Sequence, residues 1–273
     1  MAFLLGIDLG TSSVKVALFD AVTLRVVGTA DMTGDPKPDI VWRNITTGQN
    51  AVWEMDGTTN VALHWLPSVT DVTWEIVGVG DLTGDGKADL LWRRSTTGDN
   101  AVWEMDGLAH VATHWLDKVS DLTWEVKAVG DLTGDGKTDV VWRQNTTGKN
   151  AAWEMDGLTY MGLHWLMAVT DLSWGLAGVG EMTGDGKTDV LWRNLSTGQN
   201  AVWQMDGTTT AGTHWLPRVN DGTWEIVGVA DFVGSPGSYD CSAQSEIPVL
   251  ECEALVALFN GTNGDGWTDN AGW

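Results

Sequence analysis

Cysteine is nearly missing from this sequence of 273 residues, and its two copies, Cys241 and Cys252, both lie near the C-terminal end. Most of the chain therefore folds without disulfides. Long apolar runs are missing too. Nothing approaches the ~18 consecutive apolar residues of a membrane-spanning helix, so we expect no membrane span. The first residues, MAFLLGIDLG, have no basic start and contain Asp8, unlike a secretory signal.

Basic residues are scarce, with 15 Lys and Arg against 37 Asp and Glu, which gives a net charge of −22. Such a surface repels nucleic acid and anionic membranes, and we expect neither as a partner. Bound divalent cations would offset this charge, but acidity that serves only solubility explains the total equally well. The positions of the acidic residues have to decide between the two.

Phe and Tyr are also rare, at 4 and 2 residues, whereas Trp occurs 18 times. Most of the Trp fall into four series with a step of 50 residues, and so do the His of an HWL triplet. The members are Trp42, Trp92, Trp142 and Trp192; Trp53, Trp103, Trp153 and Trp203; Trp65, Trp115, Trp165 and Trp215; Trp74, Trp124, Trp174 and Trp224; and His64, His114, His164 and His214. No insertion breaks the register, which indicates four tandem units, 31–80, 81–130, 131–180 and 181–230.

Each unit contains four short strand-like segments separated by turn residues. In the second unit we expect strands at 74–81, 89–94, 101–105 and 111–116. Several are apolar on both faces, as in strands that are buried between neighbouring sheets. Four strands in a repeat of ~40–50 residues are typical of a propeller blade. We therefore predict an all-β fold, a β-propeller of four four-stranded blades.

The repeated Trp and His each have two interpretations. Most of the Trp should pack between blades, while a minority, the HWL or the NAVW series, would line exposed pockets for sugar rings. The His recur once per unit with no second His or Cys at ligand spacing. We expect a hydrogen-bonded structural imidazole rather than a zinc ligand.

An acidic loop opens each unit, and in the second unit it reads DLTGDGKAD. Oxygen-bearing side chains at loop positions 1, 3, 5 and 9, with Gly at 6, form a pattern that folds around calcium. Position 7, a Lys, would contribute its carbonyl oxygen and direct its ammonium group to solvent. We predict calcium sites with these candidate ligands: Asp81, Thr83, Asp85, Lys87 and Asp89; Asp131, Thr133, Asp135, Lys137 and Asp139; Glu181, Thr183, Asp185, Lys187 and Asp189; and, more weakly, Asp31, Thr33, Asp35 and Asp39.

The four loops are not equivalent. Glu181 is one methylene longer than the Asp that opens the other loops. Pro36 replaces the Gly of the first loop, and its fixed φ impairs that site if the turn needs a left-handed residue. A metal-free Asp/Gly turn that caps two strands is the alternative to calcium in all four.

The stretch VGVGDLTGDGKADLLWR, followed by TTGDNAVWEMDG, resembles the FG-GAP/VCBS-type repeats of bacterial secreted and surface proteins. The resemblance covers about residues 22–235. It implies a β-propeller with a calcium loop between the first and second strands of each blade. It also implies a role in adhesion or carbohydrate binding.

The two ends resemble other families. Within residues 1–30, GIDLGTSSVK resembles the first phosphate-binding hairpin of FGGY sugar kinases, which implies that Asp8, Gly10, Thr11 and Ser12 would approach nucleotide phosphates. No further kinase motif follows, so we expect residues 1–22 to be an inactive remnant. Residues 237–273 resemble the N-terminal cap of bacterial leucine-rich-repeat proteins, which implies a short helix at 251–259 and a Cys241–Cys252 bond in an oxidising compartment.

Closure of the propeller domain, residues 23–235, has two solutions, because an open arc would expose strand edges. The N-terminal hairpin could pair with an extra strand at 224–231 as an incomplete fifth blade. Alternatively, two chains could complete one ring.

For function, we expect a non-enzymatic, calcium-stabilised module that binds an extracellular glycan or a surface protein. A purely structural repeat scaffold without a small ligand is the alternative, and a kinase remnant without activity is a remote third. No Ser/His/Asp or Cys/His arrangement suggests catalysis. The compartment stays open, because the repeat and cap families are exported whereas the N-terminal motif is that of a cytosolic kinase.

Overall fold

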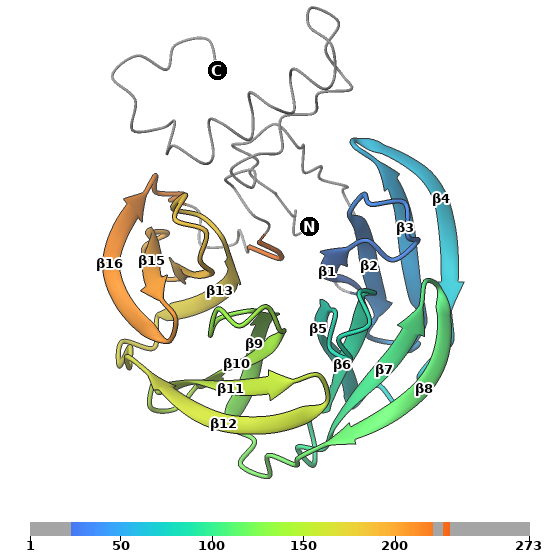
Figure 1. Ribbon diagram of the computed structural model, residues 1–273, viewed down its shortest axis with the longest axis horizontal. Coiled ribbons are helices and arrows are strands. Elements are labelled where there is room, and N and C mark those ends of the chain that lie inside the picture. Colours follow the sequence, from blue (N-terminus) through green and yellow to red (C-terminus); the bar gives the residue numbers. More distant parts are fainter. Residues whose placement is uncertain (1–22, 221–225, 230–273) are drawn as a thin grey trace, which may run out of the picture.

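The computed structural model describes residues 23–220 and 226–229. Sixteen strands form four sheets of four, arranged as blades around a central axis (Figure 1). Blade 1 contains β1 (Leu24–Ala30), β2 (Asp39–Asn44), β3 (Asn50–Asp56) and β4 (Thr59–Leu66). Blade 2 contains β5 (Trp74–Gly80), β6 (Asp89–Arg94), β7 (Asn100–Asp106) and β8 (Ala109–Leu116). Blade 3 contains β9 (Trp124–Gly130), β10 (Asp139–Gln144), β11 (Asn150–Asp156) and β12 (Thr159–Leu166), and blade 4 contains β13 (Trp174–Gly180), β14 (Asp189–Asn194), β15 (Asn200–Asp206) and β16 (Thr209–Leu216).

The predicted propeller of four four-stranded blades is confirmed. Each blade is an antiparallel meander whose strands pair in chain order, from the innermost strand at the axis to the outermost strand at the rim (Figure 1). In blade 2 the strands lie within a few residues of the segments expected from turn chemistry. The acidic loop connects the first and second strands, β5 and β6 in that blade.

The core lies between blades rather than within them. One apolar cluster joins Val41 and Val52 of blade 1 to Leu90, Trp92 and Ala101 of blade 2. Two equivalent clusters join blade 2 to blade 3 and blade 3 to blade 4. Because a strand in this position is covered on both faces, its sequence is apolar at successive positions, as DLLWRR in β6 shows.

A buried arginine fastens each blade to the next. Arg43 in β2 donates hydrogen bonds to Val69 O at 3.1 Å and to Trp74 O at 2.7 Å, at the point where the chain enters blade 2. Its guanidinium carbon lies 4.9 Å from the ring centroid of Trp92. Arg93 and Arg143 repeat these bonds and stack on Trp142 and Trp192. These Arg were not singled out in the sequence, although they recur every 50 residues beside the buried Trp.

The row of innermost strands continues beyond blade 4. A Cβ added to Gly28 of β1 would lie 2.7 Å from Val79 Cγ2 in the next blade, and one added to Gly178 of β13 would lie 2.4 Å from Val229 Cγ2. Val229 thus packs against β13 in the same way as Val79 packs against β1. Ile226–Val229 form no ladder within the described residues, and the rest of the strand expected at 224–231 lies outside them.

The remaining predictions about the ends cannot be compared with the structure. The kinase-like hairpin at 1–22, with Asp8, Gly10, Thr11 and Ser12, and the cap at 236–273, with its helix and its Cys241–Cys252 bond, lie outside the described residues. Within the described part of the chain, no helix is long and apolar enough to cross a membrane.

Candidate functional site

The acidic loops are organised by their first residue. In blade 2, Asp81 Oδ1 accepts hydrogen bonds from the N–H groups of Gly84, at 2.7 Å, and Asp85, at 3.1 Å. Its other oxygen accepts one from Gly86 N at 2.8 Å. Gly86 has a φ of 84°, a conformation that glycine adopts without a steric cost. The third loop repeats all three bonds around Asp131.

The ninth residue of the loop is fully buried and fixes the loop to the blade. Both oxygens of Asp89 accept backbone N–H bonds, Oδ2 from Leu82 and Thr83 and Oδ1 from Met105 in β7. Burial raises the pKa of Asp89, while these hydrogen bonds oppose the rise, and the pKa values of Asp39 and Asp139 rise for the same reason. This carboxylate, counted among the calcium ligands, therefore also has a structural role.

The donor set of the loops fits a hard cation in kind. Thr83 Oγ1, at position 3, is buried beside the Asp89 carboxylate, as Thr33 and Thr133 are beside Asp39 and Asp139, whereas Thr183 lies near Asp185. None of these four hydroxyls makes a hydrogen bond of good geometry. Asp81 and Asp85 add carboxylate oxygens, of which Asp81 Oδ1 already accepts two N–H bonds and Asp81 Oδ2 and Asp85 Oδ1 one each. Among the described residues, no group of three or more His, Cys, Asp or Glu is placed so that it could hold one metal ion.

The lysine at position 7 was expected to point to solvent. Its side chain is exposed, but its ammonium group also forms an ion pair. Lys87 Nζ lies 2.9 Å from Oδ1 of Asp106, the last residue of β7, while the Lys87 side chain stays 48% exposed. Hydrogen bonding to Asp106, with the attraction between their charges, raises the pKa of Lys87. Lys37, Lys137 and Lys187 form the same pair with Asp56, Asp156 and Asp206.

Two loops depart from this pattern. Pro36 has a φ of 35°, which is positive like the 84° of Gly86 in blade 2, so this turn does require a residue with a positive φ. Pro also has no N–H, so Asp31 loses the bond that Gly86 gives to Asp81. In blade 4, Glu181 Oε1 accepts N–H bonds from Thr183 and Gly184 instead.

The Trp series divide between core and surface. Trp92, in the second strand of its blade, is 2% exposed and packs against half-buried Trp103 with a centroid separation of 4.8 Å. The HWL series lies on the outermost strands. Its members, Trp65, Trp115, Trp165 and Trp215, are 65, 68, 60 and 65% exposed. Of the two series proposed from the sequence as sugar platforms, the HWL series is therefore the exposed one.

Each HWL histidine is hydrogen-bonded, as expected. His64 Nε2 lies 2.7 Å from Glu54 Oε2, and His114 and His164 lie 2.6 Å from Glu104 and Glu154. Blade 4 has Gln204 at this position, 3.3 Å from His214. The Glu partners were missed in the sequence, although the WEM motif that contains them repeats with the same step of 50.

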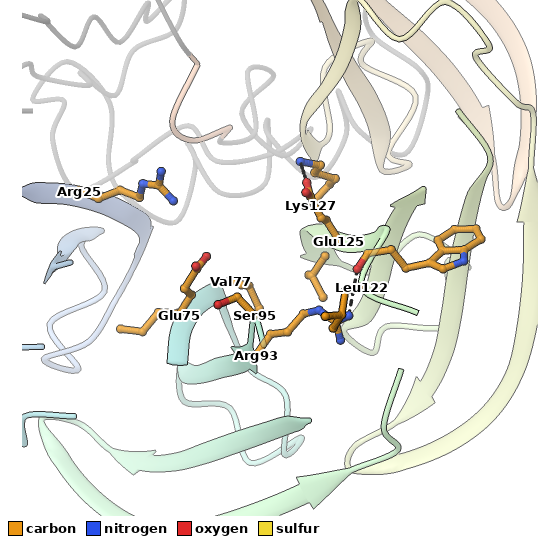
Figure 2. A pocket seen from close by; sticks show the side chains of 11 residues that line it. Arg25, Glu75, Val77, Arg93, Ser95, Leu122, Glu125 and Lys127 are labelled. Carbon is orange, nitrogen blue, oxygen red and sulfur yellow. Dashed lines mark hydrogen bonds and ion pairs between the residues drawn. The ribbon is translucent and has the colours of Figure 1, made fainter. Parts of the chain in front are cut away.

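A separate pocket lies near the start of the innermost strands (Figure 2). It encloses about 520 Å³, and its charged lining residues are Arg25, Glu75, Arg93, Glu125 and Lys127. Lys127 Nζ and Glu125 Oε2 are 2.5 Å apart and neutralise each other. The lining thus mixes three cationic side chains with two carboxylates and presents no strong charge of one sign to a ligand. The exposed Trp row is the stronger candidate.

The family model of the FG-GAP-like repeat matches residues 31–92 and 81–142. Residues 31–142 carry FG-GAP-like repeats. Each match begins at the first residue of an acidic loop and ends at the buried Trp after the next loop. The FG-GAP-like pattern thus spans the boundary between two blades of the structure. A search of curated proteins found no significant match.

Several solved structures resemble the fold at low sequence identity. Against a chain of a nidogen/laminin complex, identity is 12% and the TM-score 0.46, with 75% of this chain and 68% of that chain covered. Against virginiamycin B lyase from Staphylococcus aureus, identity is 9% and the TM-score 0.44, with 76% of this chain and 59% of that chain covered. Against a Photorhabdus luminescens Tc holotoxin pore, identity is 17% and the TM-score 0.45, with 77% of this chain and 10% of that chain covered. The chain thus spans about three fifths of the lyase, and values this low assign it no ligand or activity.

Proposed function

We propose that this FG-GAP-like propeller is a non-enzymatic binding module whose outermost Trp contact an extracellular glycan or a surface protein. The supporting observation is the exposure of Trp65, Trp115, Trp165 and Trp215, each at 60% or more on the last strand of its blade. Leaving apolar surface in water costs about 25 cal/mol per Å². Four large rings at equivalent exposed positions are a feature of interaction sites rather than of folding.

A glycan is the favoured ligand class. An exposed indole offers a flat apolar face to the C–H groups of a sugar ring, and the polar groups beside it can bond to hydroxyls. A structural scaffold without a ligand is the competing proposal. In a scaffold, the hydrogen bonds of the loops and of the buried Arg would explain the stability of the fold. They would not explain why four Trp are exposed.

Calcium is the proposed cofactor of the acidic loops. Asp81, Thr83, Asp85 and the carbonyl of Lys87 would hold the ion in blade 2, with Asp89 in support. Bound calcium would neutralise loop carboxylates in a chain with a net charge of −22 and stiffen the face of the propeller that carries the loops.

The glycan proposal is tested with a variant in which all four exposed Trp are replaced by Ala. On a glycan array the wild-type protein should give specific signals, and the variant should lose them while its melting temperature changes little. The control carries Val72→Ser and Leu172→Ser, which remove exposed apolar side chains from the connections between blades. Equal signals from wild type and the quadruple variant would contradict the proposal, and silence of the wild type on glycan and surface-protein arrays would favour the scaffold.

The calcium proposal is tested separately by thermal unfolding. Adding calcium to chelator-treated protein should raise the melting temperature, because a ligand that binds only the folded state stabilises it. Magnesium, which requires a smaller octahedral site, should raise it less. Asp85→Asn combined with Asp135→Asn should remove most of the shift, and an unchanged melting temperature in the wild type would eliminate calcium.

A further inference from the structure

Strand register shows which side chains lie on the facing sides of two neighbouring blades. His64 lies opposite Val52 across the β3–β4 ladder, and Trp115 lies opposite Ala101 across the β7–β8 ladder. Side chains that face each other across a ladder project from the same face of the sheet. Val52 and Ala101 belong to one core cluster, the one between blades 1 and 2. His64 and Trp115 therefore lie on the facing sides of blades 1 and 2, just outside that core, and we call the space between these two sides a groove.

The same construction holds at the next two interfaces. His114 pairs with Val102 and Trp165 with Ala151, and both partners lie in the core between blades 2 and 3. His164 pairs with Ala152 and Trp215 with Ala201, and both partners lie in the core between blades 3 and 4. Each groove thus combines the His–Glu pair of one blade with the exposed Trp of the following blade.

The end blades lack this combination within the described residues. Trp65 of blade 1 faces the side on which no preceding blade is described, and His214 of blade 4 has Gln204 in place of Glu. The end blades also differ in the second Trp ring that packs against the exposed Trp. Trp115, Trp165 and Trp215 lie 5.8–5.9 Å from Trp74, Trp124 and Trp174, whereas position 24 in blade 1 is Leu.

We infer that the three grooves are equivalent binding sites for a neutral pyranose ring, each formed by two consecutive blades: Glu54, His64 and Trp115; Glu104, His114 and Trp165; Glu154, His164 and Trp215. The inference rests on the proposed glycan-binding function and specifies where and how the sugar binds. The indole supplies the stacking face, and the carboxylate and imidazole supply an acceptor and a donor for neighbouring hydroxyls.

The polar groups in each groove are available to a ligand. The Glu and His side chains are 26–38% exposed, so that their second oxygen and second nitrogen can reach a sugar. The carboxylate disfavours anionic sugars in each groove, and the net charge of −22 acts in the same direction. In the second groove Lys149 Nζ, 5.9 Å from the Trp165 ring centroid, offsets part of this effect. A neutral ring with one apolar face meets both conditions.

The test follows individual Trp by ¹⁹F NMR in protein labelled with 5-fluorotryptophan, with resonances assigned by single Trp→Phe variants. The probes are the methyl glycosides of glucose, galactose and mannose, titrated separately. We expect at least one of them to shift Trp115, Trp165 and Trp215 and to leave Trp65 unchanged.

The decisive variant is Glu104→Gln, which introduces the residue that blade 4 carries naturally at Gln204. It should weaken the response of Trp165, in the next blade, about tenfold, the equivalent of one charge-assisted hydrogen bond. Trp115, in the same blade as Glu104, should respond as in the wild type. Glu154→Gln is the matched variant and should affect Trp215 in the same way.

Several results would overturn the inference. If Glu104→Gln weakens the response of Trp115 instead of Trp165, the site lies within one blade. If Trp65 responds as strongly as the other Trp in the wild type, binding does not require side chains from two blades. If no glycoside shifts these Trp while glycan-array binding persists, the glycan binds outside the grooves and the inference fails. Loss of array binding as well would mean that the proposed function itself has failed.

Discussion

At the scale of single residues, buried polar side chains hold this propeller together. Arg93 is 6% exposed and divides its donors among Gly98 O, Asn100 Oδ1, Val119 O and Trp124 O. A planar guanidinium can make four such bonds in one plane, whereas a lysine ammonium cannot. A buried charge that satisfies backbone carbonyls in two blades connects them with a fixed geometry.

Among the described residues, Pro36 is the only residue other than glycine with a positive φ, and its replacement should stabilise the protein. Pro36→Gly removes the strain of a positive φ and restores an N–H for Asp31. After the entropy cost of a new Gly, we expect a gain of about 1 kcal/mol in the free energy of unfolding. Denaturant titration measures it. Pro38→Gly, where φ is not positive, is the control and should lower stability, and a loss at Pro36 would contradict the argument.

At the scale of elements, one glycine in the hairpin between β6 and β7 docks the connection to the next blade. Gly98 O accepts the N–H of Val119 at 3.0 Å, and Gly98 itself has a φ of 78°. A Cβ at this position would lie 1.9 Å from Val119 O. Gly48, Gly148 and Gly198 meet the carbonyls of Val69, Val169 and Val219 in the same way.

Gly98→Ala should therefore destabilise the protein by more than about 2 kcal/mol, because a backbone clash adds to the conformational strain. Gly84→Ala is the matched control, since φ there is 81° but nothing lies within 4 Å of the added Cβ. It should cost only about 1–2 kcal/mol, the penalty of a left-handed Ala. Equal losses in the two variants, measured by urea unfolding, would show that the docking contact is not important.

The strands themselves could be predicted because turn chemistry delimits them. Asp106-Gly107 and the STTGDN hairpin set the ends of β7 to within a residue or two. The Lys87–Asp106 pair could not be predicted, since it depends on the acidic loop and the β7–β8 turn meeting at one end of the blade. The pairing of His114 with Glu104 depends in the same way on the β7–β8 register, which contains a bulge.

At the scale of the whole molecule, the four blades form an arc, and a segment that follows blade 4 covers its inner end. Val229→Ser should weaken this cover and lower the free energy of unfolding by about 1 kcal/mol, since a partly buried Val loses its apolar contact with β13. Hydrogen exchange should rise first in β13. Val72→Ser, at an exposed position, is the control, and unchanged exchange in β13 would show that the segment does not contribute.

The sequence by itself determined the number of repeats, the all-β class and the place of each acidic loop, because a register without insertions repeats the same local chemistry every 50 residues. It could not determine which Trp are exposed, because the HWL and buried series are equally apolar and equally regular. Only the tertiary structure decided that, since burial depends on distance from the axis. Blades diverge outward, so the ring of Trp92 is enclosed by two of them while that of Trp115, at the rim, faces water.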